Sequence, residues 1–362
     1  MPLLKTARIS ALPLFLLALL SAQIARAATW AGGTGDWTSA GVNNWGLGVG
    51  RYPGEVGIYS NETAALTTAG QVLIKPGDTI DHRKYGYVSS TTTTIKQTGG
   101  IFLNDYRIAV PTRYDLLGGT LTGNGEYRTY EGGVWNVDGG ELGTRLSTHD
   151  GLPAGDSIFN FEGSGDGTLR VTKDGIVDLH TIRMKNLTGT ALVEAVGVVP
   201  TDSDLYKRSA LYWHLNRSNA GLASVARYVF SSEGISPWKV NQLYLGTGAN
   251  SGSLDVDLSA FASAGSTNFT LFDLGQWGQL ADSGSFGNVS VRSGESMFSL
   301  GGAPTNLGSG QYYLDMAGGA YGKDIVLYFN NIPEPSAAAA LGLGALLVFL
   351  RARSHASAKR ES

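Results

Sequence analysis

The amino-acid sequence predicts an all-β protein, and two observations support this fold class. Short runs in which apolar and polar residues alternate dominate the chain, as in "SLDVDLSAF" at 253–261, where Leu254, Val256 and Leu258 share one face. Clusters of Gly, Asn, Asp or Ser bound nearly every such run, which is typical of strands separated by turns. Apolar residues at helical spacing are rarely sustained over three turns, so we expect few helices.

Gly-Gly pairs in the first half of the chain indicate which all-β architecture to expect. They open segments such as "TGGIFLND" at 98–105, "LGGTLTGNG" at 117–125 and "EGGVWNV" at 131–137, roughly 14 to 20 residues apart. This spacing matches the coil of a β-solenoid, with glycine at the corners. We therefore predict a right-handed parallel β-helix. Its inward row would hold Ile101, Leu103, Leu121 and Val134.

A β-sandwich or jelly roll with Gly-rich hairpins is the alternative fold, because alternation alone does not separate it from a solenoid.

The composition bears on function and stability. The formal net charge is -3, from 27 basic and 30 acidic residues, which argues against a nucleic-acid-binding protein. The chain contains no cysteine, so a packed core must supply its stability without disulfides.

The N-terminal residues have the organisation of a secretory signal peptide. Lys5 and Arg8 precede the apolar run 11–20, and the small-x-small sequence 25–27 ends the segment. Cleavage between Ala27 and Ala28 would remove residues 1–27 and export the rest. We expect a body at 28–331 that is released by signal peptidase.

The C-terminal residues 332–362 have a different organisation. Pro333-Glu334-Pro335 is followed by an uncharged apolar run at 336–350 and then by Arg351 and Arg353. As a helix that run would extend roughly 22 Å, short of the ~30 Å hydrocarbon core. Positive charges stay on the cytoplasmic side, so the body would face outward from a short C-terminal hydrophobic helix.

Motif, order and terminal position together resemble the sorting signal of PEP-CTERM proteins, and the Gly-Gly segments are similar to autotransporter-associated β-strand repeats of exported bacterial surface proteins. The resemblance implies recognition by an exosortase, a membrane protease that processes the chain near Pro333-Glu334-Pro335. The expected localisation is therefore a transient inner-membrane anchor followed by the cell surface or extracellular space. Two departures from the family pattern are the short apolar run and the continuation beyond the arginines to Glu361.

Candidate catalytic residues are few. The densest polar cluster, "KDGIVDLHTIR" at 173–183, contains Asp178, His180 and Arg183, which would suit a metal or a proton transfer. Solvated strand residues are the more ordinary interpretation. We predict no catalytic residue, cofactor or metal ligand, although the turn "GSGDG" at 163–167 leaves structural Ca²⁺ as an alternative.

Three tryptophans follow the predicted cleavage site. Trp30, Trp37 and Trp45 are seven or eight positions apart, near the start of the mature chain. They would cover the open first coil of a solenoid, and glycan contact through their rings is the alternative.

These observations lead to one functional hypothesis and two rivals. We expect a non-enzymatic, adhesin-like structural protein of the cell surface or of an extracellular polysaccharide matrix. The first rival is a β-helical polysaccharide lyase or hydrolase, and the second is a permanently anchored membrane protein that is not processed. An enzyme should gather carboxylates with Arg or Lys on one parallel face, whereas a scaffold should show scattered Thr, Asn and Ser.

Overall fold

A computed structural model describes part of the chain. The described residues are 28–29, 34–36, 64–66, 70–74, 79–81, 87–90, 93–104, 107–110, 113–130, 132–143, 157–162, 165–184, 188–199, 208–216, 223–261, 265–276 and 278–331. Residues 1–27, the tryptophans Trp30, Trp37 and Trp45, and the sorting segment 332–362 lie outside them. The predictions for the signal peptide, the Pro-Glu-Pro motif, Arg351, Arg353 and the hydrophobic helix therefore have no structural counterpart here.

Most of the described residues are in strands, joined by turns and loops that include two 3₁₀ turns, η2 (Gly248–Asn250) and η3 (Pro304–Asn306). The strands are β1 (Ala28–Thr29), β2 (Thr34–Asp36), β3 (Ala64–Leu66), β4 (Gly70–Ile74), β5 (Thr79–Asp81), β6 (Tyr87–Ser90), β7 (Thr93–Leu103), β8 (Arg107–Val110), β9 (Arg113–Thr122), β10 (Glu126–Tyr130), β11 (Val134–Val137), β12 (Glu141–Leu142), β13 (Ile158–Glu162), β14 (Gly167–Val171), β15 (Ile176–Met184), β16 (Thr190–Val196), β17 (Arg208–His214), β18 (Ala223–Val229), β19 (Trp238–Tyr244), β20 (Ser253–Asp257), β21 (Gly265–Asp273), β22 (Gln279–Leu280), β23 (Asn288–Ser293), β24 (Ser296–Met297), β25 (Ser299–Leu300), β26 (Gln311–Gly318) and β27 (Asp324–Asn331).

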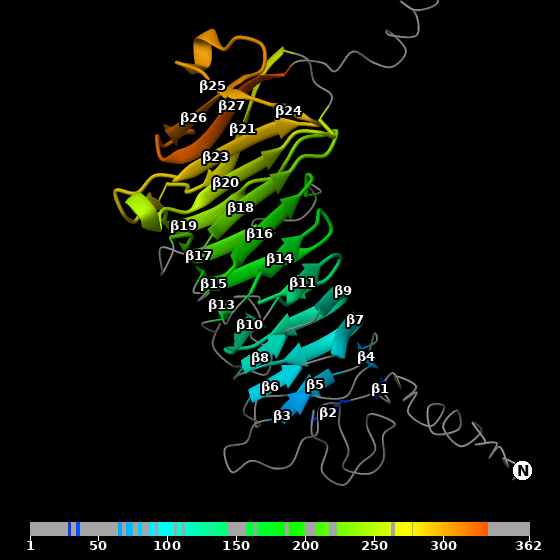
Figure 1. Ribbon diagram of the computed structural model, residues 1–362. Coiled ribbons are helices and arrows are strands. Elements are labelled where there is room, and N and C mark those ends of the chain that lie inside the picture. Colours follow the sequence, from blue (N-terminus) through cyan, green and yellow to red (C-terminus); the bar gives the residue numbers. More distant parts are fainter. Residues whose placement is uncertain are drawn as a thin grey trace, which may run out of the picture.

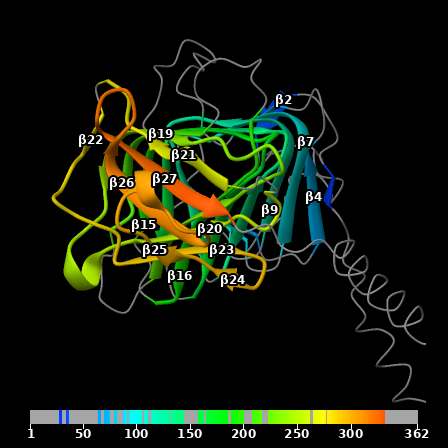
Figure 2. The same cartoon turned by 90° about the horizontal axis from the view of Figure 1, so that it is seen from above.

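Most strands pair in parallel with a strand two or three positions further along the chain. One series runs β11, β14, β16, β18, β20, β23 and another runs β13, β15, β17, β19. The strands follow one another along the long axis, from β2 and β3 at one end to β25 and β27 at the other (Figure 1). Viewed from above, the sheet curves around an interior (Figure 2). The result is a mostly parallel sheet that nearly closes into a barrel.

This architecture corrects the predicted fold class. The chain is all-β, but the right-handed parallel β-helix or β-solenoid prediction is wrong, and so is the β-sandwich or jelly-roll alternative. The predicted fold is wrong because long strands continue through the bends without a break, so the strands before and after a bend belong to one curved sheet. β15, for example, pairs with β12 through Val177 and with β13 through Thr181. Alternation and Gly spacing report local conformation, and they do not reveal whether a bend separates two sheets or curves one.

Glycines lie at the bends where the backbones of successive strands approach closely. Gly119 has φ +77°, and a Cβ there would lie 2.4 Å from the carbonyl oxygen of Gly100. At Gly175 a Cβ would lie 2.2 Å from the carbonyl oxygen of Val137. Only glycine avoids these clashes, which explains why Gly-Gly pairs recur in the sequence. The same pairs at 99–100 and 118–119 lie inside β7 and β9, where the register between the two strands shifts.

The interior is filled by successive rows of apolar side chains. Trp135 is fully buried, stacks on Tyr114 at 4.7 Å between ring centroids, and contacts Phe159 edge-on at 5.6 Å. The predicted inward row is correct for Leu103 and Leu121, which are buried. It is wrong for two positions: Ile101 and Val134 are only partly buried, while their neighbours Phe102 and Trp135 fill the core.

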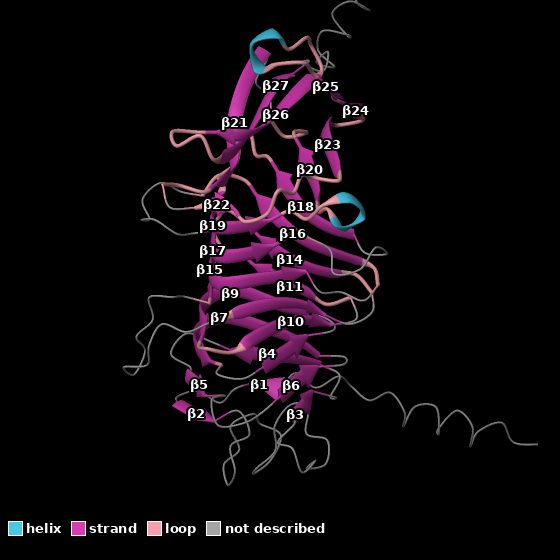
Figure 3. Ribbon diagram, turned by 90° about the vertical axis from the view of Figure 1, so that its left-hand side faces the viewer, coloured by secondary structure: helices cyan, strands magenta, loops and turns pink. Residues whose placement is uncertain are grey.

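The C-terminal end of the sheet changes to antiparallel pairing. β27 lies between β21 and β26 and pairs in antiparallel fashion with both (Figure 3). Beneath it a cluster of phenylalanine rings packs edge-to-face, with Phe230 5.0 Å from Phe269 and Phe261 5.9 Å from Phe329. This end therefore has its own aromatic core, continuous with the parallel part.

Candidate functional site

The outer face of the series from β7 to β20 carries one charged or polar side chain per strand in a single row. Consecutive members of this row are direct register partners in adjacent parallel strands. We call it the charge ladder; its members are Lys96, Asp115, Asn136, Arg170, Glu194, Arg227 and Asp255.

Charges of opposite sign in the charge ladder are close enough to pair. Arg170 Nε lies 3.1 Å from a carboxylate oxygen of Glu194, and Arg227 Nε lies 2.7 Å from Asp255 Oδ2. Arg227 also reaches Glu194 at 3.9 Å. In the next row Arg292 lies 3.0 Å from Asp257. Partial burial would raise the pKa of Asp257, but hydrogen bonds from Ser259 and the charge of Arg292 hold that pKa below its ordinary value.

The charge ladder therefore has the composition that the sequence analysis assigned to an enzyme: carboxylates and arginines on one parallel face. Its geometry differs from that of a catalytic site, because these ions form pairs along the row. A general acid or base needs a pKa moved toward the working pH. In the charge ladder each arginine instead faces a carboxylate of the neighbouring strand.

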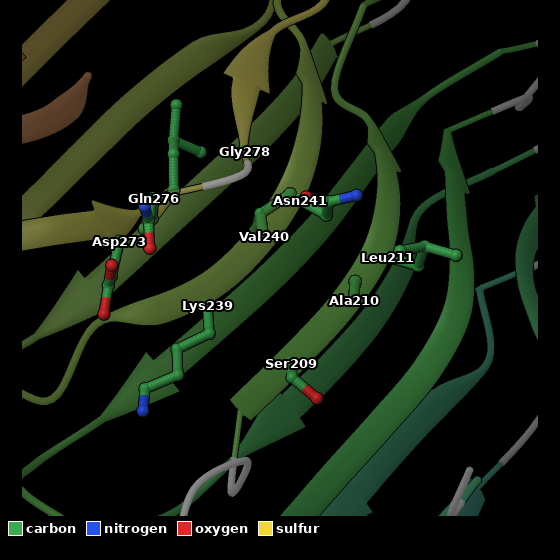
Figure 4. A pocket seen from close by; sticks show the side chains of 11 residues that line it. Ser209, Ala210, Leu211, Lys239, Val240, Asn241, Asp273, Gln276 and Gly278 are labelled. Atoms are coloured by element: carbon green, nitrogen blue, oxygen red, sulfur yellow. The ribbon is translucent and has the colours of Figure 1, made fainter. Parts of the chain in front are cut away.

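A pocket of about 350 Å³ opens on another part of the outer surface, beside β17 and β19 (Figure 4). Its wall carries the polar side chains of Ser209, Lys239, Asn241, Asp273 and Gln276. Ser209 is 1% exposed and donates its hydroxyl hydrogen to Asp178 Oδ1. Lys239, Asn241 and Asp273 are partly buried, and Gln276 is exposed at the rim. The pocket is thus lined by donors and acceptors that reach solvent.

The pocket exists because the sheet is interrupted next to β19. Lys239 pairs with Asp273 of β21, and Gln242 pairs with Gln279 of β22, so the register skips Val240 and Asn241. Between β21 and β22 the corresponding segment is 274–278, so five residues lie opposite the two residues Val240 and Asn241. Val240 and Asn241, which lie opposite this longer segment (the bulge), line the pocket together with Leu274, Gln276 and Gly278.

The bulge that forms the rim is held by side chains from β27 and the residue before it. Lys323 Nζ donates to the carbonyl oxygens of Gln276 at 3.2 Å and Gly278 at 3.1 Å. Asp324 Oδ1 accepts the backbone N–H of Leu274 at 2.9 Å. A Cβ at Gly278 would lie 1.9 Å from the carbonyl oxygen of Leu274, so the bulge requires glycine there. Leu274, Gln276 and Gly278 of the rim are therefore each hydrogen-bonded to Lys323 or Asp324.

Aromatic and histidine side chains lie near the pocket on β15, β17 and β19. The rings of His214 and Tyr244 stack at 4.2 Å with an interplanar angle of 9°. The rings of His180, on β15, and Tyr212 lie 5.2 Å apart. All four side chains are partly buried; Tyr212 directly follows the pocket residue Leu211, and His214 and Tyr244 lie three residues beyond Leu211 and Asn241. Together they form an aromatic surface next to the pocket.

The structure brings only part of the predicted polar cluster together. Asp178 is 5% exposed and accepts the Ser209 hydrogen bond, while His180 Nδ1 lies 2.9 Å from Thr181 Oγ1. Arg183 lies on the second half of β15, in register with His214. Burial, together with the charge of Asp178, raises the pKa of the nearby Glu141, while a hydrogen bond from Thr120 opposes this shift. Within the described residues no three metal-ligating side chains converge.

Sequence reasoning missed the pocket residues Lys239, Asn241, Asp273 and Gln276. The available signal was the pair of glycines, Gly275 and Gly278, after the strand-like run "FTLFDLG". Those glycines look like an ordinary strand end, and the bulge becomes recognisable only when β21 and β22 are placed against β19.

Comparisons of the chain with models of protein families, with curated proteins and with solved structures returned no match. Among the described residues, no helix has the length and apolarity to cross a lipid bilayer.

Proposed function

We propose that this protein is an exported, non-enzymatic structural or adhesive protein of the cell surface or an extracellular polysaccharide matrix. The observation that carries the proposal is the self-pairing of the charge ladder along the parallel strands. Ions that pair with one another along the outer face are not arranged to act on a substrate, which favours a structural or adhesive role over catalysis.

The bounds of the first and last strands in the sequence, β1 and β27, support export and sorting. β1 begins at Ala28, the first residue after the predicted signal-peptide cleavage. β27 ends at Asn331, two residues before Pro333. Signal peptidase and an exosortase-type protease would thus cut outside the strands, and both cuts would leave the strand pairing intact. Proline at 333 and 335 also keeps that joint out of helical structure.

The test of export is to locate the full-length protein, with its termini, in cells with and without the sorting protease. We expect a surface or extracellular form that begins at Ala28 and lacks the segment after Pro333-Glu334-Pro335. Substituting Pro333 and Pro335 by Ala should accumulate a longer, membrane-held form. A mature surface protein with an intact Ser362 would contradict tail removal, and a form confined to the cytoplasm would contradict the whole proposal.

A polysaccharide lyase remains the second candidate because the charge ladder combines carboxylates and arginines on one face. Lysis is measured as the release of unsaturated sugars from uronate-containing polysaccharides. We expect no release, with and without added Ca²⁺. Turnover that disappears in Arg170→Ala or Arg227→Ala would assign the ladder to catalysis and replace the scaffold proposal.

A further inference from the structure

We propose that the pocket beside β19 binds a neutral sugar residue of a polysaccharide chain, with the adjoining aromatic surface contacting the next part of that chain. This inference names a site for the polysaccharide contact in the proposed function and rests on that function. The occupant follows from the pocket's size, its polar side chains and its neighbours.

The size of the pocket suits a small polar ligand. About 350 Å³ lies at the low end of the range of roughly 300–1,000 Å³ that is typical of small-molecule sites. The opening is on the outer face of the sheet, so one unit of a longer chain can enter while the rest continues along the surface (Figure 4). A polymer is therefore compatible with the site.

The polar groups match the hydroxyl groups of a sugar. The side-chain amides of Asn241 and Gln276 each offer donors and an acceptor, and the carboxylate of Asp273 accepts. Neighbouring hydroxyl groups on a sugar ring both donate and accept, so they fit a mixed set of this kind. Lys239 and Asp273 are register partners in the wall, so their charges offset one another and the pocket presents no net charge to a ligand, which is why we infer a neutral residue.

The wall is pre-organised, which reduces the entropic cost of binding. Val240 and Asn241 belong to β19, which is paired with β17 on its other side. The rim is fixed through Lys323 and Asp324.

The aromatic surface extends the site. Asn241 and Tyr244 are three residues apart on β19, and both are partly buried because the alternation of burial slips between Asn241 and Gln242. Tyr244 stacks on His214, and its hydroxyl donates to Gln242 Oε1 at 2.9 Å, so the ring has a fixed orientation. The electron-rich face of an aromatic ring favours contact with the C–H-rich face of a sugar. One sugar unit would occupy the pocket, and the next unit of the same polysaccharide would contact Tyr244.

The test uses the full-length protein and an array of immobilised polysaccharides built from neutral hexoses, amino sugars or uronic acids. We expect binding to at least one neutral polysaccharide, followed by titration with its soluble oligosaccharides. Asn241→Ala should weaken binding about 2- to 10-fold, the range for losing one neutral hydrogen bond, and Asp273→Asn about 10- to 100-fold, because hydrogen bonds to a charged group contribute more. Leu211→Trp, which fills the pocket without removing a polar group, should weaken binding at least as much.

The matched control is Asn288→Ala, because it removes an exposed asparagine side chain from β23, outside the pocket. It should bind like wild type, and unchanged thermal melting will show that each variant is folded. Binding that survives all three pocket variants would overturn the site and leave the proposed function standing on another surface. Absence of binding to every neutral polysaccharide, or a preference for uronates, would also overturn this inference. The localisation experiment tests export independently.

Discussion

The inner and outer rows of the same parallel strands are built in different ways. On β11 the side chain of Trp135 is fully buried among Tyr114, Tyr127 and Phe159, whereas that of its neighbour Asn136 faces outward beside Asp115. Burial of large apolar groups contributes several kilocalories per mole for each residue, whereas exposed ion pairs contribute about 0–1 kcal/mol. The inner side chains therefore supply most of the free energy of folding, so the outer side chains can vary with function at little cost in stability.

The strongest test of this comparison is truncation of the inner row. Trp135→Ala should lower the free energy of unfolding by about 3–5 kcal/mol, because it removes ring packing and leaves the carbonyl oxygen of Arg128 without its 2.9 Å donor. Chemical denaturation measures the change. Asn136→Ala on the same strand is the control and should cost less than about 1 kcal/mol. Equal costs for the two variants would refute the division between inner and outer rows.

Arg208 tests the comparison at a charged residue inside the core. It is 2% exposed, and its guanidinium donates to the carbonyl oxygens of Ser236, Val196 and Val171. Burial lowers its pKa to about 10. Arg208→Met should destabilise the fold by about 2–3 kcal/mol, because buried carbonyl groups lose their donor. Arg170→Met on the charge ladder, measured by the same denaturation, should have a much smaller effect. An Arg208→Met protein as stable as wild type would show that the carbonyl contacts are not needed.

Alkaline pH should reveal the buried phenols. Burial raises the pKa of Tyr114 and Tyr228 well above 10, so both stay protonated in the fold while the unfolded chain ionises them near pH 10. Stability from these groups is therefore constant below pH 10 and is lost above it, by about 1.4 kcal/mol per pH unit for each phenol. Arg208 acts in the opposite direction. Its pKa in the fold is about 10, below that in the unfolded chain, so above pH 10 the folded protein has released a proton that the unfolded chain still holds, and this raises stability as pH rises.

The comparison that isolates the phenols is the pH dependence of unfolding in wild type and in Tyr114→Phe/Tyr228→Phe. Both proteins keep Arg208, but Tyr228 and Arg208 act on each other's pKa, so the single variant Tyr114→Phe is measured alongside as the case in which the Arg208 contribution cancels. The double variant will be less stable at neutral pH, since Tyr114 loses its 2.8 Å bond to Gln97 and Tyr228 its 2.6 Å bond to the Leu271 carbonyl. Its stability should nevertheless fall less steeply above pH 10. Parallel curves for the two proteins would contradict the assignment.

The smallest expected effect concerns the charge ladder. A double-mutant cycle with Arg227→Ala and Asp255→Ala should give a coupling energy of about 0.2–1 kcal/mol that shrinks as salt is added. Thermal or chemical unfolding at low and high ionic strength measures it. A coupling well above 1 kcal/mol that persists in salt would place the outer row among the main stabilising elements and weaken the comparison.

Particular residues show which parts of the fold and of the pocket the sequence pattern could predict. Alternation in "SLDVDLSAF" correctly identified Leu254, Val256 and Leu258 as buried, because period-two patterning reflects the strand geometry itself. The assignment failed at Ile101, since the register shift after Thr98 in β7 changes which residues face the core. The curvature of the sheet and the pocket at Asn241 depend on how distant segments align, and no local pattern records that alignment.

The antiparallel arrangement of β21, β26 and β27 has a consequence for assembly. A parallel sheet with an open terminal strand offers its unpaired peptide groups to another molecule, which is how fibres propagate. Here β27 has neighbours on both sides, but the edge passes to β26, which pairs on its other side with β25 only through Gln311 and Tyr312. Among the described strands, β26 from Tyr313 onward has no partner strand on that side, so this end of the sheet offers backbone groups to which a strand of another molecule could add.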